Sequence, residues 1–221
     1  MDSAKHKKVS DLHNRVFLCK KCIENGSSII FEDKEKVRRL INPRSLDSEI
    51  MIILQAPAAD QVRLSGVFFH NKNGIIGVGG SYINKYLNQI GYTIDPRQNQ
   101  YRLVYTTDAI HCFPGKSKKG NGDISPNRAE IKTCWHYLEQ EIEIINPKVI
   151  IAFGKSSSSI LFNMITNERL ENLSDIMGKS KKWSVRKTKM DVFFLPHPTS
   201  MVENKSKIFF NSFNLMLEVL Q

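Results

Sequence analysis

Long apolar runs are absent from this 221-residue sequence, and that absence excludes one large class of proteins. No apolar stretch reaches the roughly 20 residues that a membrane-spanning helix needs. The opening stretch MDSAKHKK is charged and no apolar segment follows it, which argues against a secretory signal peptide. We therefore expect a cytoplasmic protein that has no membrane partner.

Cysteine is scarce as well, because the chain has only four. In a reducing compartment, so few cysteines with one C-x2-C pair indicate a metal or cluster site rather than disulfides. Small buried thiols are the alternative, since a free cysteine often packs as a small hydrophobe. The candidate ligands are Cys19, Cys22, Cys112 and Cys134.

Acidic residues are too few to balance the basic ones, which leaves a formal net charge of +10. Such a charge favours a polyanion as partner, DNA or RNA first, with a surface kept basic for solubility as the alternative. Apolar residues make up 41% of the sequence, which is enough to build an ordinary core. We expect one domain over residues 1–221.

Four short apolar segments rich in β-branched residues have the pattern of buried parallel strands. Helical patterns lie between or after them, and this alternation predicts a parallel sheet covered on both faces. The predicted fold class is α/β, a three-layer sandwich with a central four-stranded parallel sheet. The expected strands are Glu49–Gln55, Tyr101–Asp108, Lys148–Gly154 and Asp191–Pro196.

The expected helices are marked by caps and stops. SYINKYLNQIG ends at Gly91, and a longer helix begins at a Ser125 cap with Pro126 in its first turn. Two further helices are expected in KSSSSILFNMI and NKSKIFFNSFNLMLEVL, which follow the third and fourth strands.

Polar residues follow all four expected strands, in the stretches QAPAAD, TTDAIHC, FGKSSS and LPHPTS. Ligands of open α/β sheets bind at the carboxyl ends of the strands, so these stretches predict the functional site. His197 is a candidate catalytic group there, with a structural histidine as an equal alternative. GKSSSS lacks the spaced glycines of a phosphate loop, so we interpret Ser156 as a helix cap that touches a DNA phosphate.

A C-x2-C pair is followed in order by LQAPA, VYTTDAIHCFPG, CWHYLEQEIEIINPKVIIAFG and HPTSMVEN. This order resembles the uracil-DNA glycosylase superfamily, most closely its iron–sulfur type called family 4. The likeness runs from about Cys19 to the C-terminus and is weak over residues 25–48. It implies an enzyme that flips a nucleotide out of DNA and hydrolyses its N-glycosidic bond. We expect it to act as a monomer.

The resemblance also implies a structural [4Fe–4S] cluster on the four cysteines, with residues 15–30 as an N-terminal cluster-binding segment. Thiolates are the usual ligands of such clusters, but four of them can equally hold zinc, so only the family favours the cluster. The stretch KSKKGNGD lengthens the loop between Cys112 and Cys134, which changes the nearby surface and keeps the four ligands.

Roles for pocket residues follow from the same resemblance. His197 would donate a hydrogen bond to the pyrimidine O2, and Phe69, or Phe68 beside it, would stack on the base. Core packing is the alternative for both kinds of residue. Met201 would enter the vacated base stack as an apolar wedge. The other expected DNA contacts are Ser156, Thr199 and Ser200.

The acids that the superfamily uses for catalysis are missing. Family 4 has an acid where this chain has Gln55, which we expect to face the base, and other branches use an aspartate at Ala56 or near Val78. Asp60 is the nearest remaining acid, so we expect it to orient water or to face the sugar cation. Capping a turn is its alternative role.

Asp108 replaces the asparagine with which the family reads uracil. An ionised carboxylate only accepts hydrogen bonds, so it would repel uracil O4 and accept from the N4 amino group of cytosine. A protonated Asp108 could instead donate to uracil. The stretch HNKNGII after Phe69 is longer than its counterpart in the family, which leaves room for a bulky base.

Three functions follow, in order of preference. The first is a glycosylase for a modified, cytosine-like base that acts against phage DNA with hypermodified bases. The second is a uracil-DNA glycosylase in base-excision repair. The third is a catalytically inactive DNA-binding protein with the same fold.

Overall fold

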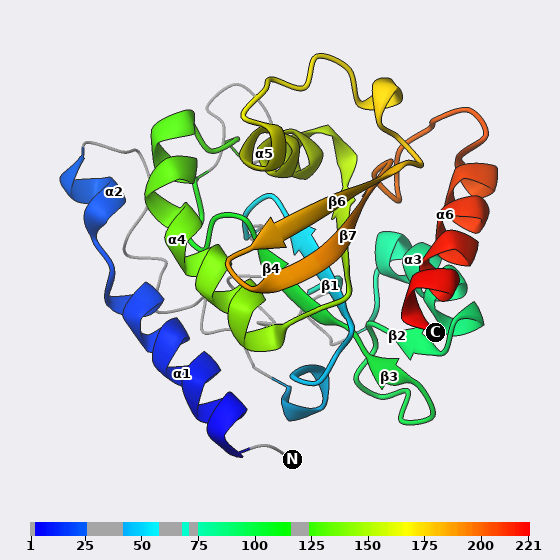
Figure 1. Ribbon diagram of the computed structural model, residues 1–221, viewed down its shortest axis with the longest axis horizontal. Coiled ribbons are helices and arrows are strands. Elements are labelled where there is room, and N and C mark those ends of the chain that lie inside the picture. The colour runs from blue at the N-terminus through cyan, green and yellow to red at the C-terminus, as the bar shows by residue number, and fades with distance from the viewer. Residues whose placement is uncertain (1–2, 26–41, 58–67, 71–74, 116–123) are drawn as a thin grey trace.

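The computed structural model describes residues 3–25, 42–57, 68–70, 75–115 and 124–221. Its central sheet is made of β1 (Ile50–Leu54), β4 (Tyr105–Asp108), β5 (Val149–Phe153), β6 (Ser180–Val185) and β7 (Thr188–Leu195). The strands lie in the order β4-β1-β5-β7-β6, and only β6 runs antiparallel to its neighbour (Figure 1). The predicted four-stranded parallel sheet is therefore confirmed, with one antiparallel strand added at its edge.

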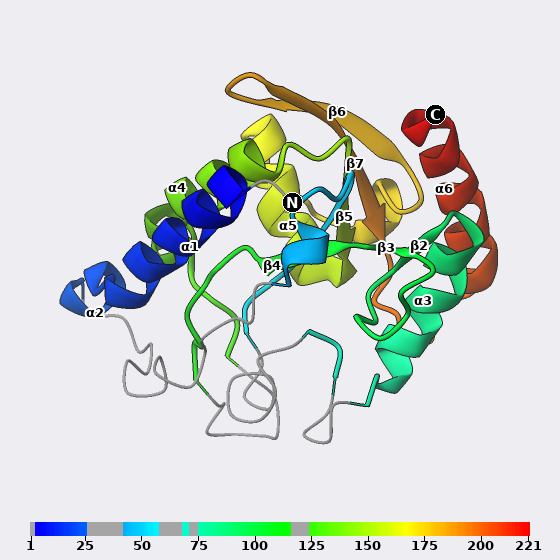
Figure 2. The same ribbon diagram turned by 90° about the horizontal axis from the view of Figure 1, so that it is seen from below.

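Helices cover both faces of this sheet, as the view in Figure 2 shows. On one face lie α4 (Arg128–Ile145) and α5 (Gly154–Thr166), with α1 (Ser3–Leu18) packed along α4. On the other face lie α3 (Val78–Gln89) and α6 (Lys205–Leu220). None of these helices has both the length and the apolar character that crossing a bilayer requires. The three predicted layers are thus two helical layers and the sheet between them.

Smaller elements surround this framework. The short helix α2 follows α1, and a two-stranded parallel sheet of β2 and β3 lies beside α3. The segment expected as one strand from Tyr101 to Asp108 is divided at Val104, whose N–H donates to the carbonyl of Thr93 instead of to the main sheet. The bounds are α2 (Lys21–Glu24), β2 (Tyr92–Thr93), β3 (Arg102–Leu103) and 3-10 turns at Pro43–Ser45 and Leu173–Asp175.

Two predicted helix caps are wrong. Asn127 caps α4, not Ser125, because its side chain accepts the N–H of Glu130 at 3.0 Å while the Glu130 carboxylate accepts the N–H of Asn127 at 2.8 Å. This reciprocal pair satisfies two helix-end donors at once. Ser156 lies inside α5, which begins at Gly154 and has no side-chain cap.

Four features expected from the sequence fall outside the described residues. They are Asp60, positions 71–74 of HNKNGII, the stretch KSKKGNGD at 116–123, and positions 26–30 of the cluster-binding segment.

Alternation along β1 decides which layer each strand-end residue faces. Met51 and Ile53 pack toward α4 and α5, whereas Ile50 and Ile52 pack toward α3 and α6, as expected for successive strand residues. Asp108 is in register with Leu54, which also packs against the α3 and α6 layer. The Asp108 side chain therefore belongs to the face of the sheet that α3 covers.

Candidate functional site

The carboxyl ends of the parallel strands lie side by side, as the register requires. Asp108 pairs with Leu54, and the β1–β4 ladder continues beyond the strands because Ile110 N–H donates to the carbonyl of Gln55 at 3.1 Å. Asp108 is fully buried and Gln55 is half-buried. Two predicted base-binding residues thus occupy neighbouring strand ends.

The loop that follows β7 is held rigidly by its own hydrogen bonds. The N–H of Ser200 donates to the carbonyl of His197 at 2.9 Å. The ammonium group of Lys205, in the first turn of α6, donates to the carbonyls of Pro198 at 2.8 Å and Ser200 at 2.6 Å. His197 therefore sits on a fixed turn at the sheet edge, although its side chain is exposed.

The imidazole of His197 is oriented by Thr199. Its Nδ1 lies 2.8 Å from the Thr199 hydroxyl and 3.4 Å from the Thr199 amide nitrogen, whose N–H donates to it. An acceptor Nδ1 leaves the proton on Nε2. Although His197 is exposed overall, partial desolvation of its ring by the surrounding atoms, and secondarily the charge of Lys205, lower the pKa of His197 below its ordinary value. The lowered pKa favours the neutral imidazole, and the Thr199 N–H contact favours the tautomer with its proton on Nε2.

Phe69 occupies a strained position opposite this loop. Its φ of +62° lies in the left-handed region, which a bulky residue rarely adopts. Its carbonyl accepts the N–H of Gly77 at 2.8 Å, and its side chain packs beside Gly80, where an added Cβ would come within 2.8 Å of the Phe69 Cβ. The start of α3 thus fixes both the backbone and the ring of Phe69.

Close approaches join these parts into one site. A Cβ on Gly79 of α3 would lie 3.3 Å from the Thr199 side chain, and one on Gly154 of α5 would lie 3.2 Å from His197. The start of α3 therefore contacts Phe69 on one side and the His197 loop on the other. The structure brings the predicted pocket residues to one edge of the sheet.

A second histidine, His70, supports the turn that contains Phe69. The buried His70 places Nδ1 2.7 Å from the carbonyl of Phe68 and Nε2 3.8 Å from Asp95. Asp95 also accepts two side-chain hydrogen bonds from Arg97, which lower its pKa to about 2. This ion pair anchors the loop on which His70 rests.

The residues expected to touch DNA surround the site on the outside. Met201, in the loop that contains His197, is fully exposed. Thr199 is exposed, Ser200 is half-buried, and Ser156 is exposed near the start of α5. An exposed apolar side chain beside a pocket is suited to enter a base stack.

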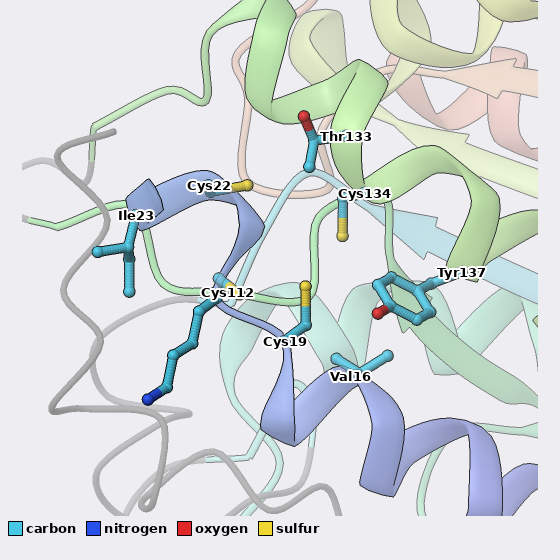
Figure 3. Close-up of a pocket in the computed structure, with 9 residues that line it drawn as sticks. Val16, Cys19, Cys22, Ile23, Cys112, Thr133, Cys134 and Tyr137 are labelled. Atoms are coloured by element: carbon cyan, nitrogen blue, oxygen red, sulfur yellow. The ribbon is translucent and has the colours of Figure 1, made fainter. Parts of the chain in front are cut away.

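The four cysteines line one small pocket behind this site, and Figure 3 shows them arranged around a common space. Cys19 and Cys22 come from the end of α1 and from α2. Cys112 follows β4, and Cys134 lies in α4. Elements far apart in the sequence thus bring together all the predicted ligands.

The surroundings of this pocket suit thiolate ligands. The N–H of His111 donates to the sulfur of Cys134 at 3.5 Å, a contact of the kind that tunes sulfur ligands. Burial, and then the hydrogen bond to Cys19, raise the pKa of Tyr137. Across the described residues, no three Cys, His, Asp or Glu side chains group tightly enough to hold a metal ion. The fit to a sulfur-bound group therefore rests on the donor set and the shared pocket.

A buried carboxylate that the sequence reasoning missed lies next to this pocket. Glu141 of α4 is completely buried and accepts hydrogen bonds from Tyr105 at 2.5 Å and Thr107 at 2.6 Å. His13 of α1 lies 2.9 Å from the same carboxylate. The sequence does contain a sign that Glu141 is buried, because it falls one helical turn after Leu138 on the apolar side of its helix.

The fold and this edge site define an α/β protein that binds its ligand where parallel strands end. Residues 43–221 match the family model of the uracil DNA glycosylase superfamily, and the chain belongs to that superfamily. The matched range contains Asp108 and His197 and begins after Cys19 and Cys22.

Curated relatives of this chain carry glycosylase names. A Type-4 uracil-DNA glycosylase of Saccharolobus solfataricus is 29% identical over 158 residues, which cover 71% of this chain and 63% of that protein. One from Archaeoglobus fulgidus is 23% identical over 194 residues, covering 88% and 83%. A Type-5 uracil-DNA glycosylase of Pyrobaculum aerophilum is 24% identical over 111 residues, covering 50% and 46%. The chain thus spans less than two thirds of the length of the first relative.

Proposed function

We propose that this protein is a DNA glycosylase that hydrolyses the N-glycosidic bond of a flipped-out, modified cytosine-like base and leaves an abasic site. The observation that carries the proposal is the fully buried Asp108, which ends β4 on the sheet face that also holds Phe69. Membership of the superfamily and the names of the relatives support glycosylase activity.

His197 stabilises the leaving base in this proposal. Cleavage leaves negative charge on the base, and the Nε2–H of a neutral imidazole donates to the pyrimidine O2 as that charge develops. Thr199 holds the ring in the required tautomer. Removal of one such preorganised donor costs roughly 10²–10³ in rate, which is the loss expected when the His197 imidazole is removed.

Asp108 selects the base. When ionised, its carboxylate accepts a hydrogen bond from the N4 amino group of a cytosine-like ring and repels the O4 of uracil. Phe69 stacks on the ring, and Gln55 at the next strand end faces the base edge. The length of the stretch after Phe69 in the sequence is the argument for a base with a bulky substituent, and residues 71–74 of it lie outside the described residues.

The sugar side of the reaction needs a group that orients water or balances the cationic sugar. We assign this role to Asp60, which lies outside the described residues. Gln55 and Ala56, where relatives in the superfamily would place an acid, are described and carry no charge. The assignment therefore rests on Asp60 being the acid nearest to them in the sequence.

DNA is the proposed partner. Met201 fills the gap that the flipped nucleotide leaves, and its full exposure supports that role. Thr199 and Ser200 follow His197 on the same loop, and Ser156 lies near the helix start of α5, where a phosphate is favoured. The net charge of +10 favours binding of the phosphate backbone.

A [4Fe–4S] cluster is the proposed cofactor, bound by Cys19, Cys22, Cys112 and Cys134. The donor set of four thiolates and the shared pocket support it, and the Type-4 relatives favour it over zinc. The group would pin three chain segments together next to the DNA-facing edge. An absorbance band near 400 nm with bound iron would support a cluster, whereas a colourless zinc protein would contradict it.

Phage DNA with hypermodified cytosine is the proposed biological target. A glycosylase that ignores ordinary bases and removes such a base would damage the invading genome alone. Uracil repair is the second candidate function, because the curated relatives are named for uracil. A catalytically inactive DNA-binding protein is the third.

A direct test uses duplex and single-stranded oligonucleotides that carry one uracil, cytosine, hydroxymethylcytosine or glucosylated hydroxymethylcytosine. Abasic sites are detected by alkaline cleavage, with His197→Ala as the inactive control. We expect release of a modified cytosine. Release of uracil alone would establish the repair function instead, and no release from any substrate would favour the inactive protein.

A further inference from the structure

Glu141 joins three chain segments, each of which leads to one of the cysteines. It lies on one of these segments and makes close polar contacts with the other two. Its helix α4 also carries Cys134, which lies about two helical turns earlier. Its carboxylate oxygens accept hydrogen bonds from the hydroxyl groups of Tyr105 and Thr107. Both residues lie on β4, the strand that leads to Cys112. His13, on the helix that leads to Cys19, reaches the same carboxylate at 2.9 Å.

A buried charge of this kind has to be matched by its surroundings. Glu141 has no exposed side-chain surface, and an unmatched carboxylate in a protein interior is strongly unfavourable. Each oxygen of Glu141 accepts one hydroxyl donor, and His111 adds a ring nitrogen 3.8 Å from one of them. The carboxylate is therefore stable only while α1, β4 and α4 keep their present positions.

Apolar packing alone would position α1, β4 and α4 less specifically than the hydrogen bonds to Glu141 do. Val9 and Leu12 of α1 are completely buried and hold the helix against the rest of the protein without fixing its exact position. Such contacts tolerate small shifts along the helix axis, whereas hydrogen bonds of 2.5 to 2.9 Å do not. Glu141 thus fixes the positions of α1, β4 and α4 relative to one another, whereas the apolar contacts only hold these elements together.

We propose that Glu141 is the positioning residue that sets the four cysteine thiols at the spacing needed to bind their group. The inference rests on the proposed cluster site, and it names a role for a residue that contacts no ligand itself. Thr107 precedes Asp108 directly, so the same carboxylate also fixes the strand end from which the base is read.

The test compares Glu141→Gln with Glu143→Gln in the full-length protein. Glu143 lies on the same helix, is partly exposed and pairs with Arg186 at the surface, so it is a matched control. Iron loss is followed by the fall in absorbance near 400 nm after addition of a strong chelator. We expect Glu141→Gln to lose iron about tenfold faster than wild type, the lower end of the effect of removing a group bonded directly to a metal ligand, because Glu141 acts only through the chain segments that it joins. Glu143→Gln should match wild type.

General destabilisation is separated from positioning by a second control. Phe213→Leu creates a defect on the opposite face of the sheet, in the α6 layer. It should lower the thermal unfolding midpoint without speeding iron loss at temperatures where the protein stays folded. Faster iron loss in Phe213→Leu equal to that in Glu141→Gln would overturn the proposal.

A metal-independent measurement keeps the idea testable if the wild type proves to hold no iron. A short bifunctional thiol reagent should cross-link the cysteines of metal-free wild type and Glu141→Gln with different yields, lower in the variant. Tyr105→Phe combined with Thr107→Val should reduce the yield as well. Equal yields in all these proteins would refute a positioning role for Glu141, whereas iron-free wild type with unequal yields would refute only the cluster.

Discussion

Thr199 contacts the Nδ1 side of the His197 ring twice. The Nδ1 atom of His197 lies 2.8 Å from the Thr199 hydroxyl and 3.4 Å from the Thr199 amide nitrogen, whose N–H donates to it. This geometry favours the tautomer with its proton on Nε2, because a proton on Nδ1 would meet an N–H donor. A residue two positions away in a rigid turn thereby decides what His197 can offer a substrate.

Replacing Thr199 by valine should weaken catalysis without abolishing it. The variant keeps the backbone N–H but loses the hydroxyl, so we expect kcat to fall about tenfold, against roughly 10²–10³ for His197→Ala. Single-turnover kinetics on the preferred oligonucleotide would measure both. A drop in substrate binding with unchanged kcat would contradict the assignment of Thr199 to the ring.

Asp108→Asn should move base preference toward uracil. The amide can donate to O4, whereas the carboxylate only accepts, and one good polar contact is worth about 1–3 kcal/mol of discrimination between bases. The ratio of kcat/KM for uracil over the modified cytosine should therefore rise by roughly 10- to 100-fold. An unchanged ratio would show that Asp108 does not read the base.

Met201→Ala should affect duplex DNA more than single strands. A wedge is needed only when a base is extracted from a stack, and unstacking costs a few kcal/mol. We expect activity on duplex substrate to fall severalfold or more, while activity on single-stranded substrate stays close to wild type. Parallel assays on the two forms of one sequence provide the comparison, and equal losses on both would contradict the wedge.

Asp95→Asn should destabilise the fold in a pH-dependent way. The side-chain hydrogen bonds from Arg97 lower the pKa of Asp95 from an ordinary 3.8 to about 2. A carboxyl whose pKa is depressed by folding stabilises the protein above its unfolded pKa, and that stabilisation is lost as pH falls through the folded pKa. Because Arg97 is largely exposed, we expect a loss of about 1 kcal/mol at pH 7.

The difference between Asp95→Asn and wild type should shrink between about pH 4 and pH 2. Urea unfolding at a series of pH values measures it. Asp47→Asn is a suitable control, because that carboxylate is 67% exposed and pairs with Lys5 at 3.3 Å. A constant difference over the whole pH range would exclude the ion pair as its cause.

Most of the fold could be read from the sequence because the buried strands are continuous apolar runs. The edge strand β6 was missed, since SKKWSV opens with three polar residues and only its pairing with β7 makes it a strand. α1 was missed for a related reason. Its sequence is polar on most sides, and it is ordered by packing along α4.

The sequence points to candidate site residues through their chemistry and gives little sign of the residues that support them. Asp108, His197 and the cysteines are identifiable because their residue types stand out at strand ends and in a C-x2-C pair. Thr199 is not, since a threonine in a loop is common everywhere, and Glu141 stands out only as a glutamate on the apolar side of its helix, which does not name its partners. Their importance comes from partners that are remote in sequence or from ring geometry, which spacing alone does not reveal.

Gly80 limits how position 69 can be engineered. A Cβ at position 80 would lie 2.8 Å from the Phe69 Cβ and 2.7 Å from the Ile76 side chain, so any residue other than glycine there would force a neighbour to shift. Every residue except glycine at position 69 keeps that Cβ, and it must also adopt the left-handed backbone. A library that varies residue 69 to admit larger bases should therefore leave Gly80 unchanged and include glycine and asparagine at position 69.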